Sequence, residues 1–153
     1  MKLDETDIRI LDILQGNGRI KNAELAAAIG ISPSPMLERV KKLERNGVIQ
    51  KYVALVDAAR IGKAVTALVS VSLAVHQLET LENFEKKVTQ FSEVVECFHI
   101  TGESDFFLKV VVSGMDAYRE FVLHKLTQIK GINRIRSSFV LDKVKVTTKI
   151  EVS

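Results

Sequence analysis

The side chains best suited to contacting a charged partner lie between residues 31 and 47. Arginine can donate two parallel hydrogen bonds to the edge of a guanine, and serine hydroxyls can bond to several base edges. Lysine and arginine can also neutralise phosphates, which sets affinity rather than sequence preference. If the segment binds double-stranded DNA, eight residues are the candidates for the contact, namely Ser32, Ser34, Pro35, Glu38, Arg39, Lys41, Lys42 and Arg45.

These residues are expected to differ in their tasks. Arg39 is the predicted base-reading side chain, whereas Lys41, Lys42 and Arg45 are expected to face phosphates. Glu38 could accept a hydrogen bond from cytosine, orient Arg39, or remain a solvated charge. Taken alone, the segment fits an amphipathic surface helix about as well as it fits a DNA-binding helix. The helices predicted before it must therefore distinguish the two interpretations.

Local signals predict that this segment is a helix. Ser32 is an N-cap candidate, and the two prolines after it fall in the first turn, where a missing N–H costs nothing. Leu37, Val40 and Leu43 recur every three residues and predict an apolar stripe. Gly47 can adopt the left-handed conformation that ends a helix.

Two shorter helices are predicted before it. Asp4, with Asp7 three residues later, has the spacing of a capping box at the start of a first helix that ends at residues 16–18. A second helix is predicted over 22–29, and Gly30 ends it. Three helices in this order, with a short glycine-containing turn between the last two, are typical of a helix-turn-helix.

The pattern changes after this region. Residues 48–55 are β-prone and predict a wing or a connecting strand, and the residues around Gly62 read as a linker. From Val65 onward apolar residues alternate with polar ones, as they do in strands. Strands are predicted at 65–73, 94–100, 106–112, 133–141 and 144–150, with helices at 80–90 and 115–130.

The order β-α-β-β-α-β is that of a ferredoxin-like domain. The predicted fold class is therefore α+β, with an N-terminal three-helix winged helix-turn-helix and a C-terminal ferredoxin-like βαββαβ domain. The expected boundaries are 1–56 for the DNA-binding domain, 57–64 for the linker, and 65–153 for the ferredoxin-like domain.

Composition excludes several classes of site. The 153 residues carry a formal charge of +3, which alone is weak evidence for a nucleic-acid partner. Cys97 is the single cysteine, so an intramolecular disulfide or a cysteine cluster cannot form. No histidine has metal-ligand spacing, and no glycine-rich phosphate loop is present, so no metal and no cofactor are expected. No signal peptide and no apolar run of about 18 residues is found, which predicts a cytoplasmic protein without a membrane partner.

The turn from Gly102 to Asp105 is the second candidate site, and two interpretations remain open. It fits a plain β-hairpin turn in which Gly and Asp serve backbone geometry. It also fits a small zwitterion site, because an amino acid needs amide donors for its carboxylate and an acceptor for its ammonium group. A purely hydrophobic pocket could not orient such a ligand.

The chain resembles the Lrp/AsnC family, also called feast/famine regulatory proteins, over essentially its whole length. The helix-turn-helix and hairpin motifs occur in the family's order and separation, and Ser32–Pro35 is similar to the leucine-responsive subgroup. The matching motifs are Leu3-Asp4-x-x-Asp7-x-x-Ile10-Leu11, Gly18-Arg19-Ile20, Glu24-Leu25-Ala26, Gly30-Ile31-Ser32-Pro33, the run from Leu37 to Ile49, and Gly102-x-x-Asp105-Phe106.

The resemblance implies a transcriptional regulator of amino-acid-related metabolism whose C-terminal domain pairs its sheets into dimers, which assemble into octamers. It implies an amino-acid effector bound between dimers, near the loop that contains Gly102 and Asp105. Glu103 and Ser104 stand at variable positions of that loop. A second set expected near the loop consists of Phe98, Met115 and Ser138.

Two other functions fit parts of the sequence. One is a ligand-independent, nucleoid-type architectural protein, which binding measurements with amino acids would separate. The other is an enzyme, because haem-precursor decarboxylases are similar to this family in architecture. That reading would need His99 and His124 to handle a tetrapyrrole carboxylate. The preferred prediction is a DNA-binding regulator and not an enzyme.

Overall fold

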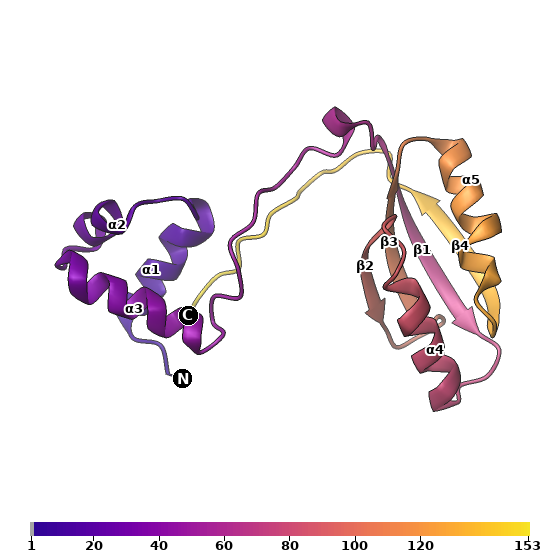
Figure 1. The fold of residues 1–153 in the computed structure, drawn as a ribbon, viewed down its shortest axis with the longest axis horizontal. Helices are drawn as coiled ribbons and strands as arrows, with labels where there is room; N and C mark the ends of the chain where they lie inside the picture. The colour runs from indigo at the N-terminus through magenta and orange to yellow at the C-terminus, as the bar shows by residue number, and fades with distance from the viewer. Residues whose placement is uncertain (1) are drawn as a thin grey trace. The chain divides into compact units, whose positions relative to one another are not determined.

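The chain folds into two compact units in a computed structural model that describes residues 2–153 (Figure 1). The first unit comprises the chain up to Leu55 together with Lys145–Ser153, and the second is Val56–Val144. Each unit has its own hydrophobic core. The predicted C-terminal domain, 65–153, thus differs from the second unit, because its last nine residues pack with the N-terminal helices.

The first unit contains three helices close to the predicted bounds, α1 (Glu5–Gly16), α2 (Asn22–Ile29) and α3 (Pro33–Arg45). The predicted capping box is confirmed at the start of α1. The Asp7 amide donates to the Asp4 carboxylate at 2.8 Å, and the Asp4 amide donates to the Asp7 carboxylate at 3.3 Å. Gly30 ends α2 with a φ of 87°, a left-handed conformation that glycine adopts without strain.

The core of the first unit differs in one respect from the predicted stripe. Met36 on α3 is fully buried, whereas Leu37 is 42% exposed. A period of 3.6 residues places Met36, Val40 and Leu43 on one face, and Leu37 turns away from it. The buried residues of this core are Ile10, Leu11, Leu25, Ala26, Ile29, Met36 and Leu43.

Two predicted strands do not form. Residues 48–56 and 140–153 contain no strand, so the predictions of a strand over 48–55 and over 144–150 are wrong. Alternating apolar residues identify a strand only when a neighbouring strand completes the hydrogen-bond ladder and a core covers one face. Val144 and Val146 are 94% and 73% exposed, so nothing covers either side chain in the chain as described.

The second unit is a four-stranded antiparallel sheet with two helices, as the ferredoxin-like prediction requires. Its strand order is β2-β3-β1-β4. The elements are β1 (Val65–Leu73), α4 (Leu78–Val88), β2 (Val94–His99), β3 (Phe106–Val112), α5 (Met115–His124) and β4 (Ile132–Phe139), with short 3-10 turns at Ala59–Ile61 and Leu126–Gln128.

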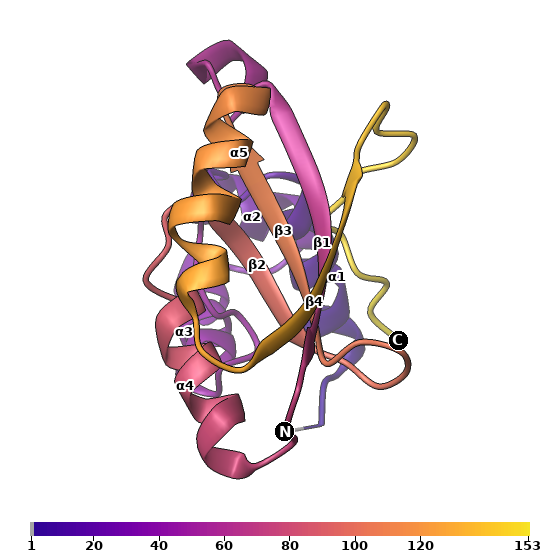
Figure 2. The same ribbon diagram turned by 90° about the vertical axis from the view of Figure 1, so that its right-hand side faces the viewer.

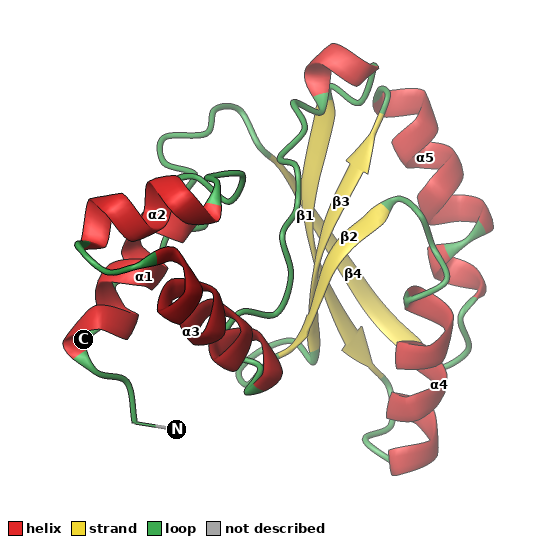
Figure 3. Ribbon diagram, turned by 60° about the vertical axis from the view of Figure 1, so that its left-hand side comes forward, coloured by secondary structure: helices red, strands yellow, loops and turns green. Residues whose placement is uncertain are grey.

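Both helices of the second unit cover the same face of the sheet (Figures 2 and 3). Phe84 on α4 and Phe121 on α5 are buried against Val69 and Leu108 of the central strands. Cys97 is half-buried and packs against this core, as expected of a small apolar residue. In the described part of the chain, no helix is long and apolar enough to cross a membrane.

The opposite face of the sheet carries no helix of the second unit. Phe107 pairs directly with Phe98 and with Ser70, and Leu68 lies two residues from Ser70 on β1, so Leu68, Phe107 and Phe98 lie on this side. Phe98 is 50% exposed, and Leu68 and Phe107 are half-buried. We call this surface the open face of the sheet.

Candidate nucleic-acid interface and ligand site

The exposed side of α3 carries seven of the eight predicted DNA-binding residues. Ser34, Glu38, Lys41 and Arg45 follow one another at spacings of three and four, which places them on one face of the helix. Lys41 and Glu38 form an exposed ion pair at 3.5 Å. The exposed set is Ser32, Ser34, Pro35, Glu38, Lys41, Lys42 and Arg45.

Ser32 occupies the N-cap position of α3, but its side chain makes no capping hydrogen bond. The physical reason lies three residues further on. An N-cap hydroxyl usually accepts from the second or third amide of the helix, and the third residue here, Pro35, has no N–H, which leaves the Ser34 amide as the one usual donor. Ser32 is therefore the N-cap residue, as predicted, but its exposed hydroxyl makes no hydrogen bond to the first turn of α3.

Arg39 is placed differently from the other seven residues. Its guanidinium lies 2.7 Å from the Asp4 carboxylate and 2.8 Å from the Asp7 carboxylate, and both acids belong to the capping box of α1. The Asp7 side chain is only 5% exposed. The hydrogen bond from the Asp7 amide, together with the Arg39 guanidinium, holds the pKa of Asp4 below its usual value of 3.8. Base reading by Arg39 stays a prediction, and the structure gives its side chain a second task, which is to hold α3 against α1.

Arg39→Ala is expected to destabilise the first unit by about 1–3 kcal/mol, because it leaves the buried Asp7 carboxylate without its charged partner. Urea denaturation of the full chain measures this effect. Arg45→Ala removes the same type of side chain from the exposed face of α3 and should change stability by less than about 0.5 kcal/mol. Equal stability of both variants would show that the ion pairs contribute nothing.

The pH dependence of these ion pairs has a defined sign. The pKa of Asp4 is lowered in the folded chain, so its contribution to stability is complete above the ordinary value of 3.8 and is lost as the pH falls through the folded value. Arg39→Ala should therefore unfold more readily than the wild type at neutral pH, and the difference between the two should shrink below about pH 4.

The second candidate site is the loop before β3. The Asp105 amide donates to the Val71 carbonyl at 2.9 Å, and its carboxylate accepts from the Leu73 amide at 2.7 Å. The Ser72 hydroxyl donates to the Glu103 carbonyl at 3.3 Å. Gly102 has a φ of 119°, which other residues adopt only with strain. These bonds hold the loop against the end of β1, as the plain-turn interpretation expects.

The Oδ2 atom of Asp105 accepts the hydrogen bond from the Leu73 amide, and the other oxygen, Oδ1, is held less firmly. Its Oδ1 lies 2.8 Å from Nε2 of His76, whose side chain is 67% exposed, while the Asp105 side chain is 17% exposed. An exposed imidazole on a loop can swing away at small cost. The geometry therefore offers a shielded carboxylate oxygen that a ligand ammonium group could take over from His76.

The second predicted set does not gather at this loop within one chain. Phe98 pairs with Phe107, close to the Asp105 end of β3, and Ser138 pairs with Leu68 near the middle of the sheet. Met115 follows the far end of β3, which is about 20 Å away at 3.3 Å per residue. Within one chain a strand separates Met115 from the loop, so the expected place of Met115 beside an effector bound between dimers stays a prediction.

Two cations beside the loop were missed from the sequence. Arg136 of β4 pairs with Ser70 and Arg134 pairs with Ser72, so both share the face of the Ser72 side chain. Arg136 also lies 3.8 Å from the Glu103 carboxylate. Both arginines are exposed. The signal was present, since two arginines at i and i+2 of a strand point to the same side.

The other candidate side chains remain apart. His99 stacks on Phe106 with ring centroids 4.8 Å apart, and the exposed His124 lies 3.3 Å from Glu120 on α5. Each histidine of the proposed enzyme site thus has its own local contact. Among residues 2–153, no group of three or more His, Cys, Asp or Glu could hold a metal ion.

Family models match both units of the chain. Residues 3–50 match a winged helix-turn-helix DNA-binding model, and residues 66–150 match the Lrp/AsnC ligand binding domain. These two ranges contain every candidate residue described above. The exposed α3 surface lies in the first range and the Asp105 loop in the second.

Relatives match along nearly the whole chain. It is 37% identical over 150 residues to the transcriptional regulator AzlB of Bacillus subtilis, covering 98% of this chain and 96% of AzlB. It is 36% identical over 148 residues to the leucine-responsive regulatory protein of Escherichia coli, covering 97% and 90%. The crystal structure of a Neisseria meningitidis transcriptional regulator in complex with L-Met superposes with a TM-score of 0.93 at 39% identity, covering 97% and 96%.

Proposed function

Because the chain belongs to the Lrp/AsnC family of transcriptional regulators, we propose that it regulates transcription in response to an amino acid that binds beside Asp105. One observation carries the effector assignment. The Asp105 carboxylate is shielded from solvent, is fixed by the Leu73 amide, and keeps one oxygen that only an exposed His76 side chain covers.

The chemistry beside the loop supports a zwitterionic ligand. Asp105 supplies the acceptor that an ammonium group needs, and Arg134 and Arg136 supply cations for a carboxylate. The Neisseria relative was solved with L-Met, an amino acid with both groups. Phe98, half-exposed on the adjacent strand, offers an apolar surface for the ligand side chain.

The DNA contact is proposed to lie on the exposed face of α3. Its N-terminal tip, with Ser32 and Ser34, is assigned to base edges, while Lys42 and Arg45 are assigned to phosphates. Arg39 is assigned to a base edge as well as to holding α3 against α1 through Asp4 and Asp7. Charged contacts of the second kind make affinity depend on salt.

The open face of the sheet is proposed to pair with its equivalent in a second copy, and such dimers to assemble further toward octamers. Leu68 and Phe107 of the central strands are apolar, and the helices of their own unit leave them uncovered. A self-complementary patch of this kind is the usual basis of a two-fold dimer. Several copies in one assembly would array several α3 helices, so modest single-site affinity would become tight.

The whole proposal is tested by recovering genomic DNA fragments on the purified protein with and without each of the twenty amino acids. We expect a limited set of fragments, and one or a few amino acids that change their recovery. Recovery of all fragments equally, whatever amino acid is added, would instead identify an architectural DNA-binding protein.

The phosphate assignments predict a change in salt dependence. Lys42→Ala and Arg45→Ala should each reduce the slope of log affinity against log salt by about one unit on a random duplex. Fluorescence anisotropy between about 50 and 200 mM salt measures this slope. Lys87→Ala, which removes an exposed lysine from α4 in the second unit, is the matched control and should leave the slope unchanged. An unchanged slope in Lys42→Ala and Arg45→Ala would place the DNA elsewhere.

A further inference from the structure

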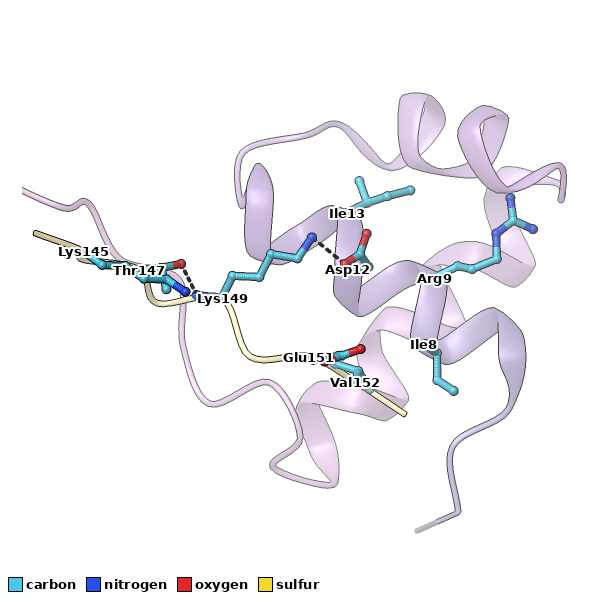
Figure 4. Close-up of a pocket in the computed structure, with 9 residues that line it drawn as sticks. All are labelled: Ile8, Arg9, Asp12, Ile13, Lys145, Thr147, Lys149, Glu151 and Val152. Atoms are coloured by element: carbon cyan, nitrogen blue, oxygen red, sulfur yellow. Dashed lines mark hydrogen bonds and ion pairs between the residues drawn. The ribbon is translucent and has the colours of Figure 1, made fainter.

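The C-terminal tail, Lys145–Ser153, lies against α1 in the first unit (Figure 4). A groove of about 740 Å³ runs between them and is lined by Ile8 and Asp12 of α1 and by Lys149 and Val152 of the tail. We propose that this side of α1 is a docking site for an extended peptide, and that its occupant is the C-terminal tail of the same chain.

Gln15 provides the contact that recognises an extended backbone. Its side-chain nitrogen donates to the Ile150 carbonyl at 2.8 Å, and its side-chain oxygen accepts from the Ile150 amide at 2.7 Å. A single side-chain amide thus pairs with both polar groups of one residue, as a neighbouring β-strand would. Ile150 is 74% exposed, so the site binds the backbone of this residue and not its side chain.

Two neighbouring contacts give the site its preference for this tail. Lys149 Nζ lies 2.5 Å from the Asp12 carboxylate, and Asp12 precedes Gln15 by three residues, which places both on one face of α1. Val152 packs against the hydrophobic core of the first unit. The site therefore takes an extended segment with a cation followed, three residues later, by an apolar side chain.

Docking gives the DNA-binding unit a second connection to the effector unit. The chain leaves the first unit after Leu55, and it returns through the residues that follow β4. The tail ends on α1, the helix whose Asp4 and Asp7 hold Arg39 of α3. The tail is thus a second covalent path from β4 to α1, beside the 48–56 segment.

Charge exchange in the full chain tests this site. Asp12→Lys should raise backbone amide exchange over residues 145–153 by about two- to fivefold, because like charges now face each other at an exposed pair. Adding Lys149→Asp in the same chain should restore most of the protection. Gln15→Ala should raise exchange at the tail by about tenfold, because Ile150 loses both of its partners. Glu5→Ala, an exposed change on the same helix, should have no effect.

The same variants distinguish the proposed occupant from others. If the tail exchanges as fast as a free peptide in the wild type, or if Gln15→Ala changes nothing, the site is not a dock and the proposal falls. If protection also returns when Asp12→Lys chains are mixed with Lys149→Asp chains, the occupant is the tail of a second copy, and the intrachain connection is wrong.

Discussion

Asp105→Ala is expected to weaken amino-acid binding by about 100-fold while leaving DNA binding measurable. The ligand ammonium group loses its charged acceptor, whereas the α3 surface belongs to a different unit with its own core. Calorimetry with the responsive amino acid measures the first effect, and anisotropy with a DNA duplex measures the second.

Alanine also removes the acceptor of the Leu73 amide, so loss of binding could come from a distorted loop. Asp105→Asn separates the two causes. The asparagine oxygen can still accept from Leu73, while the negative charge is gone. We expect the thermal stability of Asp105→Asn to stay near that of the wild type and its ligand affinity to fall nearly as far as in Asp105→Ala. Wild-type affinity in Asp105→Asn would mean that Asp105 serves the loop alone.

The role of His76 provides an internal check on this site. Its imidazole Nε2 lies 2.8 Å from Oδ1 of Asp105, the oxygen that we assign to the ammonium group. His76→Ala removes that competitor and should bind the amino acid at least as tightly as the wild type does. A large loss of affinity in this variant would instead make His76 a direct ligand contact.

The sequence was most informative where structure is decided locally. The capping box at Asp4 and Asp7 and the left-handed glycine at Gly30 depend on neighbouring residues, so α1 and the turn before α3 were predicted closely. Helical and alternating apolar patterns gave the order of the second unit in the same way. Pro35, three residues after Ser32, removes one of the two amides that could have donated to the Ser32 hydroxyl.

Contacts between residues far apart in the sequence could not be predicted from local patterns of charge and hydrophobicity. Arg39 and Asp7 are 32 positions apart, and nothing in the local charge pattern of α3 marks Arg39 as the cation that turns inward. Gln15 and Ile150 are 135 positions apart. The alternation over 144–150 predicts a strand, because nothing near Ile150 in the sequence indicates that a distant side-chain amide binds its backbone. Met115 was grouped with the loop through a family resemblance, which does not state which copy of the chain supplies a residue.

Phe107→Asp is expected to disrupt the sheet-to-sheet dimer that we propose. Phe107 lies on the open face, next to Phe98 and Ser70 and away from the core that α4 and α5 cover. Burying a carboxylate in a sheet-to-sheet contact costs several kcal/mol, whereas in a separate copy the same carboxylate stays hydrated. Static light scattering should therefore report a mass near that of one chain, and circular dichroism should remain that of the wild type.

Leu123→Asp makes the same apolar-to-charged change on the exposed side of α5, where Leu123 is 49% exposed, and should leave the mass unchanged.

DNA-binding measurements then distinguish the contact of a single α3 helix with DNA from the gain that several α3 helices in one assembly provide. On a duplex with one site, Phe107→Asp should bind about as well as the wild type does. On a fragment with several sites it should bind about 10²- to 10⁴-fold more weakly, because each α3 helix now acts alone. An unchanged mass would move the interface away from the open face, and an unchanged multisite affinity would show that single α3 helices suffice for tight binding.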